Sequence, residues 1–238
     1  MMDSQGEHIS NQFDLELDNL KTLLLEAGGL VERQLAKASY SLLEYDTSVA
    51  QKVVDCDDEI DSLECKIDES AHLIIAKRQP TAKDLRLVLT IIKTIRDLER
   101  MGDESSKIAK MAIRLSEETE SRIGFAEFRR ISERVQSMVK SCLDAFARSD
   151  VAAAVEVAKE DSTVDMEYAS AMRALITYMI EDQRSITRVL NLLWALRALE
   201  RIGDHARNIA EQVIYLVNGT DVRHSNIEDF VVSVNKTD

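Results

Sequence analysis

Apolar side chains recur every three or four positions along most of this chain, which is the period of an α-helix. Before position 45 they fall at Phe13, Leu17, Leu20, Leu24, Val31, Leu35 and Leu42. This spacing places them on one helical face, as expected for a helix that packs against others. The same analysis predicts long helices over about 9–45, 47–78, 81–115, 125–148, 150–181 and 185–217.

Residues that break helices are few. The chain has one proline, Pro80, and seven glycines in 238 residues. Pro80 separates the second predicted helix from the third, and Gly219 follows the end of the sixth. Gly28 and Gly29 instead lie inside the first helix, where they indicate either a kink or a close contact with another helix. We therefore predict an all-α chain.

The helical pattern occurs twice. The first part repeats 104 positions later, in the pairs Leu24 and Phe128, Leu35 and Val139, and Asp61 and Asp165. From Val88 the separation becomes 101, in the pairs Val88 and Val189, Glu99 and Glu200, and Gly102 and Gly203. A loop near Pro80 would absorb the difference. The simplest explanation is a duplicated unit of three helices. We place the two copies at 1–116 and 124–219, followed by a tail at 220–238.

Each unit carries two pairs of carboxylates at a spacing of four. The third helices carry Glu99 with Asp103 and Glu200 with Asp204, and the second helices carry Asp57 with Asp61 and Asp161 with Asp165. A spacing of four puts both acids on one side of a helix, where like charges repel. Burial costs more still unless a cation or strong donors answer the charge. If these helices are antiparallel neighbours, the two pairs of a unit face each other.

The acids predict metal binding, with an arginine network as the alternative. Carboxylate oxygens suit hard cations such as Mg²⁺, Ca²⁺, Mn²⁺ or ferric iron. Alternatively, the arginines at helical spacing from the acids neutralise them: Arg96, Arg100, Arg197 and Arg201. The repetition of the pair at matching places favours metal. The predicted ligands are Asp57, Asp61, Glu99, Asp103, Asp161, Asp165, Glu200 and Asp204. Gly102 and Gly203 leave room beside them.

The two units differ next to these acids. His205 follows Asp204 and is a further candidate ligand, whereas Glu104 stands at the corresponding position in the first unit. We expect the second site to accept iron, manganese or zinc more readily, and the first to prefer harder ions. The predicted cofactors are therefore divalent or trivalent metal ions, with Mg, Mn, Fe and Zn as candidates.

Charge and hydropathy exclude several classes of function. The formal net charge of −13 argues against binding to nucleic acid or to anionic lipid, because either needs a basic face. No apolar run reaches the roughly 18 residues that a membrane span needs. The N-terminus also lacks the profile of a signal peptide. We expect a soluble, cytoplasmic protein without direct membrane insertion.

Evidence for catalysis is weaker than evidence for metal. Glu69 and His72 have the ExxH spacing of di-iron bundles, but their counterparts, Arg173 and Ile176, cannot complete such a site. We interpret Trp194 as a partly buried packing residue, with a binding anchor as the alternative. A metal-dependent hydrolase or oxidase built on the same acids is the alternative function. Repeated alike pairs without a distinct nucleophile favour a non-enzymatic protein.

Several segments together resemble the PhoU family. They are LERMGDE at 98–104, LERIGDH at 199–205, IAKRQPTAKDLR at 75–86, HISNQF at 8–13 and TYMIED at 177–182. The resemblance covers nearly the whole chain. It implies two tandem three-helix bundles with a pseudo-twofold relation, acidic pairs that hold metal clusters, and no catalytic activity.

The same resemblance implies a function and partners. A PhoU-like protein would be a negative regulator of the phosphate-starvation response, linking the phosphate ABC transporter to a membrane sensor histidine kinase when phosphate is plentiful. The implied partners are the ATPase component of the transporter and the cytoplasmic region of the kinase. We also expect a homodimer.

Overall fold

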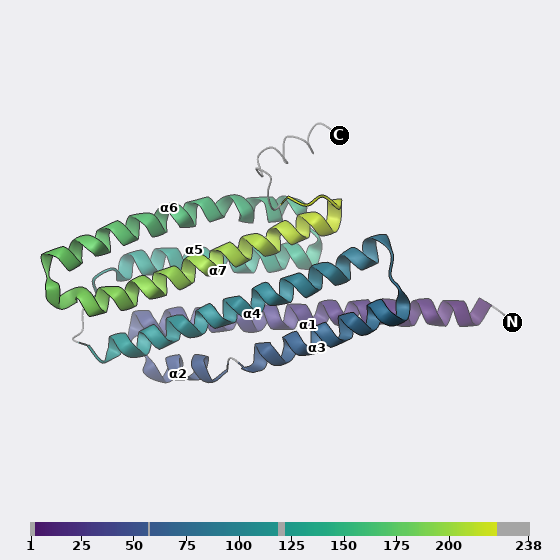
Figure 1. Ribbon diagram of the computed structural model, residues 1–238, viewed down its shortest axis with the longest axis horizontal. Coiled ribbons are helices and arrows are strands. Elements are labelled where there is room, and N and C mark those ends of the chain that lie inside the picture. Colours follow the sequence, from purple (N-terminus) through teal and green to yellow (C-terminus); the bar gives the residue numbers. More distant parts are fainter. Residues whose placement is uncertain (1–2, 57, 119–121, 223–238) are drawn as a thin grey trace, which may run out of the picture.

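A computed structural model describes residues 3–56, 58–118 and 122–222, and all its regular elements are helical (Figure 1). The α-helices are α1 (Asp3–Glu44), α2 (Thr47–Asp55), α3 (Asp58–Arg78), α4 (Ala82–Ser116), α5 (Phe125–Arg148), α6 (Val151–Glu181) and α7 (Ile186–Asn218). A short 3₁₀-helix, η1 (Gln183–Ser185), precedes α7. The prediction of an all-α chain is therefore confirmed for the described residues. None of the helices in this part of the chain combines the length and apolarity needed to cross a membrane.

The helices form two bundles that lie side by side along their lengths (Figure 1). Unit one consists of α1 to α4, and unit two of α5 to α7. Between the units, α4 packs against α7 and α1 packs against α5. These are equivalent helices of the two repeats, so each unit meets the other through the same faces, as a pseudo-twofold relation requires.

The second helix of unit one differs from its prediction. The sequence pattern predicts one helix over 47–78, but α2 ends at Asp55 and α3 begins at Asp58. Aspartates compete for backbone hydrogen bonds and so favour helix ends. The acids in the first turn of α3 are also stabilised by the helix dipole. The cap of α2 is Asp46, whose carboxylate accepts a hydrogen bond from the backbone N–H of Val49 at 3.0 Å.

The glycines of α1 mark a close contact between the units. Helix α1 runs without interruption past Gly28 and Gly29. A Cβ atom on Gly28 would lie only 2.7 Å from Cδ2 of Leu143 on α5. Of the two interpretations, close packing is therefore correct at Gly28, because α5 occupies the space that a larger residue would fill.

A buried arginine joins the units at one end of the molecule. Arg188 on α7 is 5% exposed and donates a hydrogen bond to the hydroxyl of Tyr45, at the end of α1. Its guanidinium also lies 5.6 Å from the ring centres of Tyr45 and Phe125. Hydrogen bonding and cation–π attraction together satisfy a charge that would otherwise be costly to bury.

Candidate metal-binding sites

The predicted acids of unit two come together between α6 and α7. We call Asp161, Asp165, Glu200 and Asp204 cluster two. Asp161 is 3% exposed and Glu200 is 9% exposed, whereas Asp165 and Asp204 reach solvent. Burial raises the pKa of Glu200, and the charges of Asp204 and Asp165 raise it further. Burial also raises the pKa of Asp161, together with the charges of Asp204 and Asp165, and that of Asp204, together with the charge of Asp165. The carboxylates of the two helices therefore lie close enough to repel one another.

Arginines neutralise part of the negative charge of cluster two. Arg207 donates to Asp161 Oδ2 at 3.1 Å and to Glu211 Oε1 at 3.0 Å. Arg197 forms an ion pair with Glu200. Arg201, another arginine of the predicted network, instead pairs with Glu104 in unit one at 2.8 Å. The network thus exists in unit two, but its main member, Arg207, was not among the predicted arginines.

The acids of unit one form a second group between α3 and α4. We call Asp61, Glu64, Glu99 and Asp103 cluster one; the predicted ligand Asp57 lies outside the described residues. Burial raises the pKa of Glu99, followed by the charges of Asp103, Glu64 and Asp61. Burial likewise raises the pKa of Glu64. Among the described residues, none of these four carboxylates has an ion pair or hydrogen bond.

Glu64 is a cluster residue that the sequence analysis missed. Its counterpart in unit two, 104 positions later, is Tyr168. Because the prediction relied on acids that recur in both units, an acid present in only one unit gave no signal. The spacing of Glu64 from Asp61 on α3 is the only feature that pointed to it.

Cluster two has several properties that suit a cation. Oε2 of Glu200 is buried and has no hydrogen-bond partner among the described residues. A Cβ atom on Gly203 would lie 3.8 Å from Asp161 Oδ1, so the glycine leaves space beside the carboxylates. Four carboxylates match the oxygen ligands that hard cations prefer. In their present rotamers, however, no three described His, Cys, Asp or Glu side chains are gathered closely enough to hold an ion. Metal binding therefore stays a prediction and requires side-chain rotation.

His205 lies at the contact between the units. Its Nδ1 is 2.8 Å from Asp97 Oδ1 on α4, and Asn208 also donates to that oxygen at 3.1 Å. Since an ionised carboxylate only accepts, Nδ1 carries the proton, and Nε2 of a neutral ring keeps its lone pair. This arrangement is common in metal-ligating histidines. The role of His205 as a ligand stays a prediction.

Trp194 contradicts the interpretation of a packing residue. Its side chain is 64% exposed on α7. The apolar stripe of this helix passes through Val189 and Leu196, and a step of two from Leu196 turns Trp194 away from the core. The alternative, that Trp194 is a binding anchor, is consistent with its exposure.

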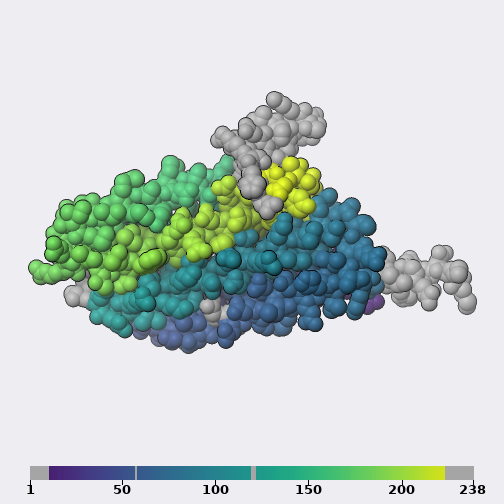
Figure 2. All heavy atoms as spheres, in the orientation of Figure 1, coloured from purple at the N-terminus to yellow at the C-terminus, as the bar shows by residue number. Residues whose placement is uncertain are grey.

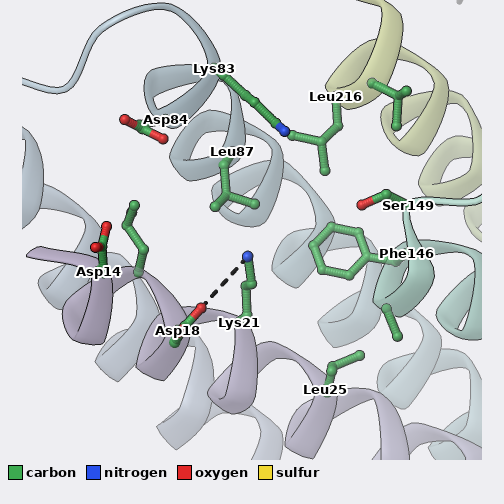
Figure 3. Close-up of a pocket in the computed structure, with 13 residues that line it drawn as sticks. Asp14, Asp18, Lys21, Leu25, Lys83, Asp84, Leu87, Phe146, Ser149 and Leu216 are labelled. Carbon is green, nitrogen blue, oxygen red and sulfur yellow. Dashed lines mark ion pairs between the residues drawn. The ribbon is translucent and has the colours of Figure 1, made fainter. Parts of the chain in front are cut away.

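A separate cleft of about 500 Å³ lies where α1, α4, α5 and α7 meet. Figure 3 shows the charged side chains of Asp14, Asp18 and Asp84 on one side and the apolar Phe146 and Leu216 on the other. Lys21 lies between them and forms a 3.7 Å ion pair with Asp18. The cleft contains none of the predicted site residues.

Comparison with known proteins identifies related chains. The model of the PhoU domain matches residues 24–112 and 128–213, one match in each unit. The phosphate-specific transport system accessory protein PhoU homolog of Pseudomonas aeruginosa is 56% identical over 222 residues, which cover 93% of this chain and 92% of that protein. The corresponding protein of Escherichia coli is 42% identical over 219 residues, 92% of this chain and 90% of its own.

Solved structures agree with the predicted fold. The crystal structure of PhoU from Pseudomonas aeruginosa matches with a TM-score of 0.86 and 55% identity, covering 87% of this chain and all of that chain. The phosphate transport system regulatory protein PhoU from Streptococcus pneumoniae matches with a TM-score of 0.81 and 30% identity, covering 88% and 99%. The two-unit helical fold is thereby confirmed.

Proposed function

Because the chain belongs to the PhoU family, we propose that it is a negative regulator of the phosphate-starvation response. The observation that carries this proposal is the family match, which covers both units. It is supported by the names of the relatives, which are accessory proteins of the phosphate-specific transport system in Pseudomonas aeruginosa and Escherichia coli. The Streptococcus pneumoniae structure is described as a regulatory protein of phosphate transport.

The proposed mechanism is that of an adaptor. When phosphate is plentiful, the protein binds the ATPase component of the phosphate ABC transporter and the cytoplasmic region of the sensor histidine kinase, and holds the kinase in its repressing state. Two long bundles packed lengthwise offer extended helical surfaces for such contacts (Figure 1). An adaptor with these partners works in the cytoplasm, and we expect it to be a homodimer.

Metal ions fit this mechanism as structural switches. A divalent or trivalent ion bound by cluster two would supply positive charge that cancels the repulsion among its carboxylates. Asp161 and Asp165 would then hold α6 against Glu200 and Asp204 on α7, and cluster one would do the same for α3 and α4. Each bound ion would favour the conformation in which its two helices are held together, and so shift the population that partners recognise.

We also propose that the protein is not an enzyme. Both clusters consist of carboxylates of the same kind. Neither offers the separate general acid and general base that a hydrolase needs. The relatives are named for accessory or regulatory roles. A metal-dependent hydrolase or oxidase would show turnover of phosphate esters or oxygen by purified, metal-loaded protein, and we expect none above the level of a Glu99→Ala/Glu200→Ala variant.

Deletion of the gene tests the regulatory proposal. In a deletion strain, a reporter driven by a phosphate-starvation promoter should remain active in phosphate-rich medium, because the kinase is no longer held in its repressing state. Reintroducing the wild-type chain should restore repression. Normal repression in the deletion strain would disprove the proposal.

A further inference from the structure

A cationic groove of about 420 Å³ lies on the surface between α4 and α7. It is lined by Lys107 and Arg114 of α4 and by Arg197, Arg201 and Trp194 of α7, and we call it the Trp194 groove. Figure 2 shows the surfaces of these two helices next to each other on the viewed face. Four cations gathered in one groove contrast with the formal net charge of −13 of the chain.

The charges in the groove are arranged with the acid inside and the cations outside. Glu104 is almost fully buried, and its Oε1 accepts a hydrogen bond from Lys107 at 3.0 Å and forms an ion pair with Arg201 at 2.8 Å. Both cationic side chains are at least 40% exposed. Because one bond uses only part of their donor capacity, they can still bind an anion. Arg114 forms no ion pair with any described residue. The groove therefore attracts negative charge.

An apolar line leads into the groove along α7. Ile186, Leu190 and Trp194 are all exposed and follow one another at steps of four, so they lie on one side of the helix. At 1.5 Å per residue this line is roughly 12 Å long, and the cations at Arg197 and Arg201 continue it. Single exposed apolar residues are common, but a contiguous line of them indicates a binding surface. Tryptophan and arginine are also the residues most enriched where protein contacts contribute most binding energy.

We propose that the Trp194 groove, together with Ile186 and Leu190, binds an acidic amphipathic helix of a partner protein. Apolar side chains one turn apart on that helix would contact the line on α7, and its carboxylates would pair with the cations of the groove. From Ile186 to Arg201 the surface spans roughly 22 Å, the length of a helix of about 15 residues. A small anion would use the cations and leave the apolar line uncovered. The inference rests on the proposed adaptor function, because it supplies a surface for one of the adaptor's partners.

The first test is a titration followed by fluorescence. Trp194 is the one tryptophan of the chain, so its emission reports on the groove directly. The probe is a synthetic helical peptide with leucines one turn apart and glutamates on the adjoining face. It should shift the emission to the blue and bind more weakly as salt is added, because screening weakens the ion pairs. The matched control is the same peptide with lysines in place of glutamates, which should bind at least tenfold more weakly.

Small anions provide the opposing arm of this titration. Inorganic phosphate and ATP should compete with the acidic peptide only weakly, because neither covers the apolar line. If either one saturates the groove while the acidic peptide does not bind, the ligand is a small anion and the inference is wrong.

Two groove variants and two matched controls test the surface itself. Trp194→Ala and Arg114→Glu should each weaken binding of the acidic peptide at least tenfold, measured by calorimetry, since one removes the apolar anchor and the other reverses a charge. Met166→Ala on α6 alters a side chain that is equally exposed, at 64%, and Arg33→Glu reverses an exposed charge on α1. Both controls should bind like the wild type. All four changes are at the surface and should fold normally. Unchanged binding by both groove variants would overturn the inference.

The same variants, mixed with the purified ATPase component and kinase cytoplasmic region, separate this inference from the adaptor proposal. Loss of binding to one partner in both groove variants would support the inference. If the wild type binds a partner and both groove variants bind it equally well, the groove inference fails while the adaptor proposal stands. If the wild type binds neither partner, the adaptor proposal fails, and the peptide titration still decides on the groove. If Trp194→Ala converts a dimer into monomers, a second copy of the chain covers the groove and the inference is wrong.

Discussion

The two acidic clusters occupy equivalent places in the two units but differ in how far arginines neutralise their charge. In cluster two, Arg207 bonds to Asp161, and Arg197 pairs with Glu200. In cluster one, Arg96 corresponds to Arg197, and Ser106 corresponds to Arg207. Ser106 is buried and cannot supply charge. Cluster one therefore holds its carboxylates together without an ion pair among the described residues.

This difference shows that a duplicated motif need not keep a duplicated environment. An arginine and a metal ion are alternative ways of neutralising the same carboxylates. Where the arginine is present, as in unit two, a cation must compete with it for Asp161. In unit one no arginine is bonded to the acids, and the charges of Arg96 and Arg100 offset only part of the repulsion that a bound cation would remove. We therefore expect cluster one to depend on metal more strongly, and the following predictions test that comparison.

The largest expected effect is the loss of metal from one unit while the other unit keeps its metal. Glu200→Ala/Asp204→Ala should remove the metal of unit two only, and Glu99→Ala/Asp103→Ala should remove that of unit one only, because each pair belongs to its own cluster. Elemental analysis of protein purified without added metal measures the content, and circular dichroism checks that the helices remain. Unchanged metal content in a double variant would show that its acids are not ligands.

A second prediction concerns Arg207, which is present in unit two and replaced by Ser106 in unit one. Arg207→Ala leaves the carboxylates of Asp161 and Glu211, which are almost fully buried, without their cation. Breaking a fully buried pair costs about 3–5 kcal/mol, and since Arg207 is 40% exposed we expect about 2 kcal/mol of lost unfolding free energy in metal-free protein. Chemical denaturation measures this. The matched variant Ser106→Ala in unit one should be close to neutral, and an equal loss in both variants would contradict the comparison.

A third prediction uses the glycine of each motif. A Cβ atom on Gly203 would meet Val164 at 3.6 Å and Asp161 at 3.8 Å, which are ordinary van der Waals contacts. Gly203→Ala should therefore stabilise metal-free protein by about 1 kcal/mol through helix propensity. The added methyl group should also narrow the space beside Asp161 and weaken metal binding in unit two. Gly102→Ala is the matched change in unit one. If Gly203→Ala binds metal as well as the wild type, the glycine does not serve the site.

The smallest expected effect is a pH dependence. The pKa values of Glu99 and Glu200 are raised in the folded protein, chiefly by burial and then by neighbouring carboxylates. The folded state then binds protons that the unfolded chain has released, so stability falls as pH rises from the ordinary value of 4.5 through the raised pKa values. Metal-free protein should thus become more stable on mild acidification from neutral pH. Glu16 has the opposite effect below pH 4.5. Its hydrogen bond with Arg78 lowers its pKa, so the stability that this residue contributes is lost as the pH falls further.

Matched variants identify the groups responsible for this slope of stability against pH. Glu99→Gln should reduce it through cluster one and Glu200→Gln through cluster two, with the larger change for Glu99, because Arg197 is bonded to Glu200 whereas Arg100 acts on Glu99 only through its charge. Denaturation curves at several pH values, recorded with a chelator, measure the slope. A slope that neither variant changes would place its origin elsewhere in the molecule.

The arrangement of helices could be predicted well because it depends on local periodicity. The predicted end at Arg148 and start at Phe125 coincide with those of α5, and the three extra residues near Pro80 coincide with the break between α3 and α4. The division between α2 and α3 was missed, since the acidic segment that begins at Asp55 was interpreted as part of one helix over 47–78. Only the competition between helix interior and helix end decides such a break.

The candidate sites could be predicted only in part. Repetition identified acids that occur in both units, and the structure brings the described ones together in two clusters. Repetition could not reveal Glu64 or Arg207, which have no chemical counterpart in the other unit. It also could not show that Arg201 pairs with Glu104 across the contact between the units, because that pairing depends on how the bundles are placed.

The packing of α4 against α7 and of α1 against α5 has a consequence for the origin of the chain. Equivalent helices meet across the contact, which is the geometry of a symmetric dimer of identical subunits. An ancestral polypeptide of half this length could therefore have assembled with itself before gene fusion joined the copies. After fusion, the two sides of the contact no longer had to have the same sequence. Pairings such as Asp97 with His205, which have no equivalent in the other half of the contact, could then arise.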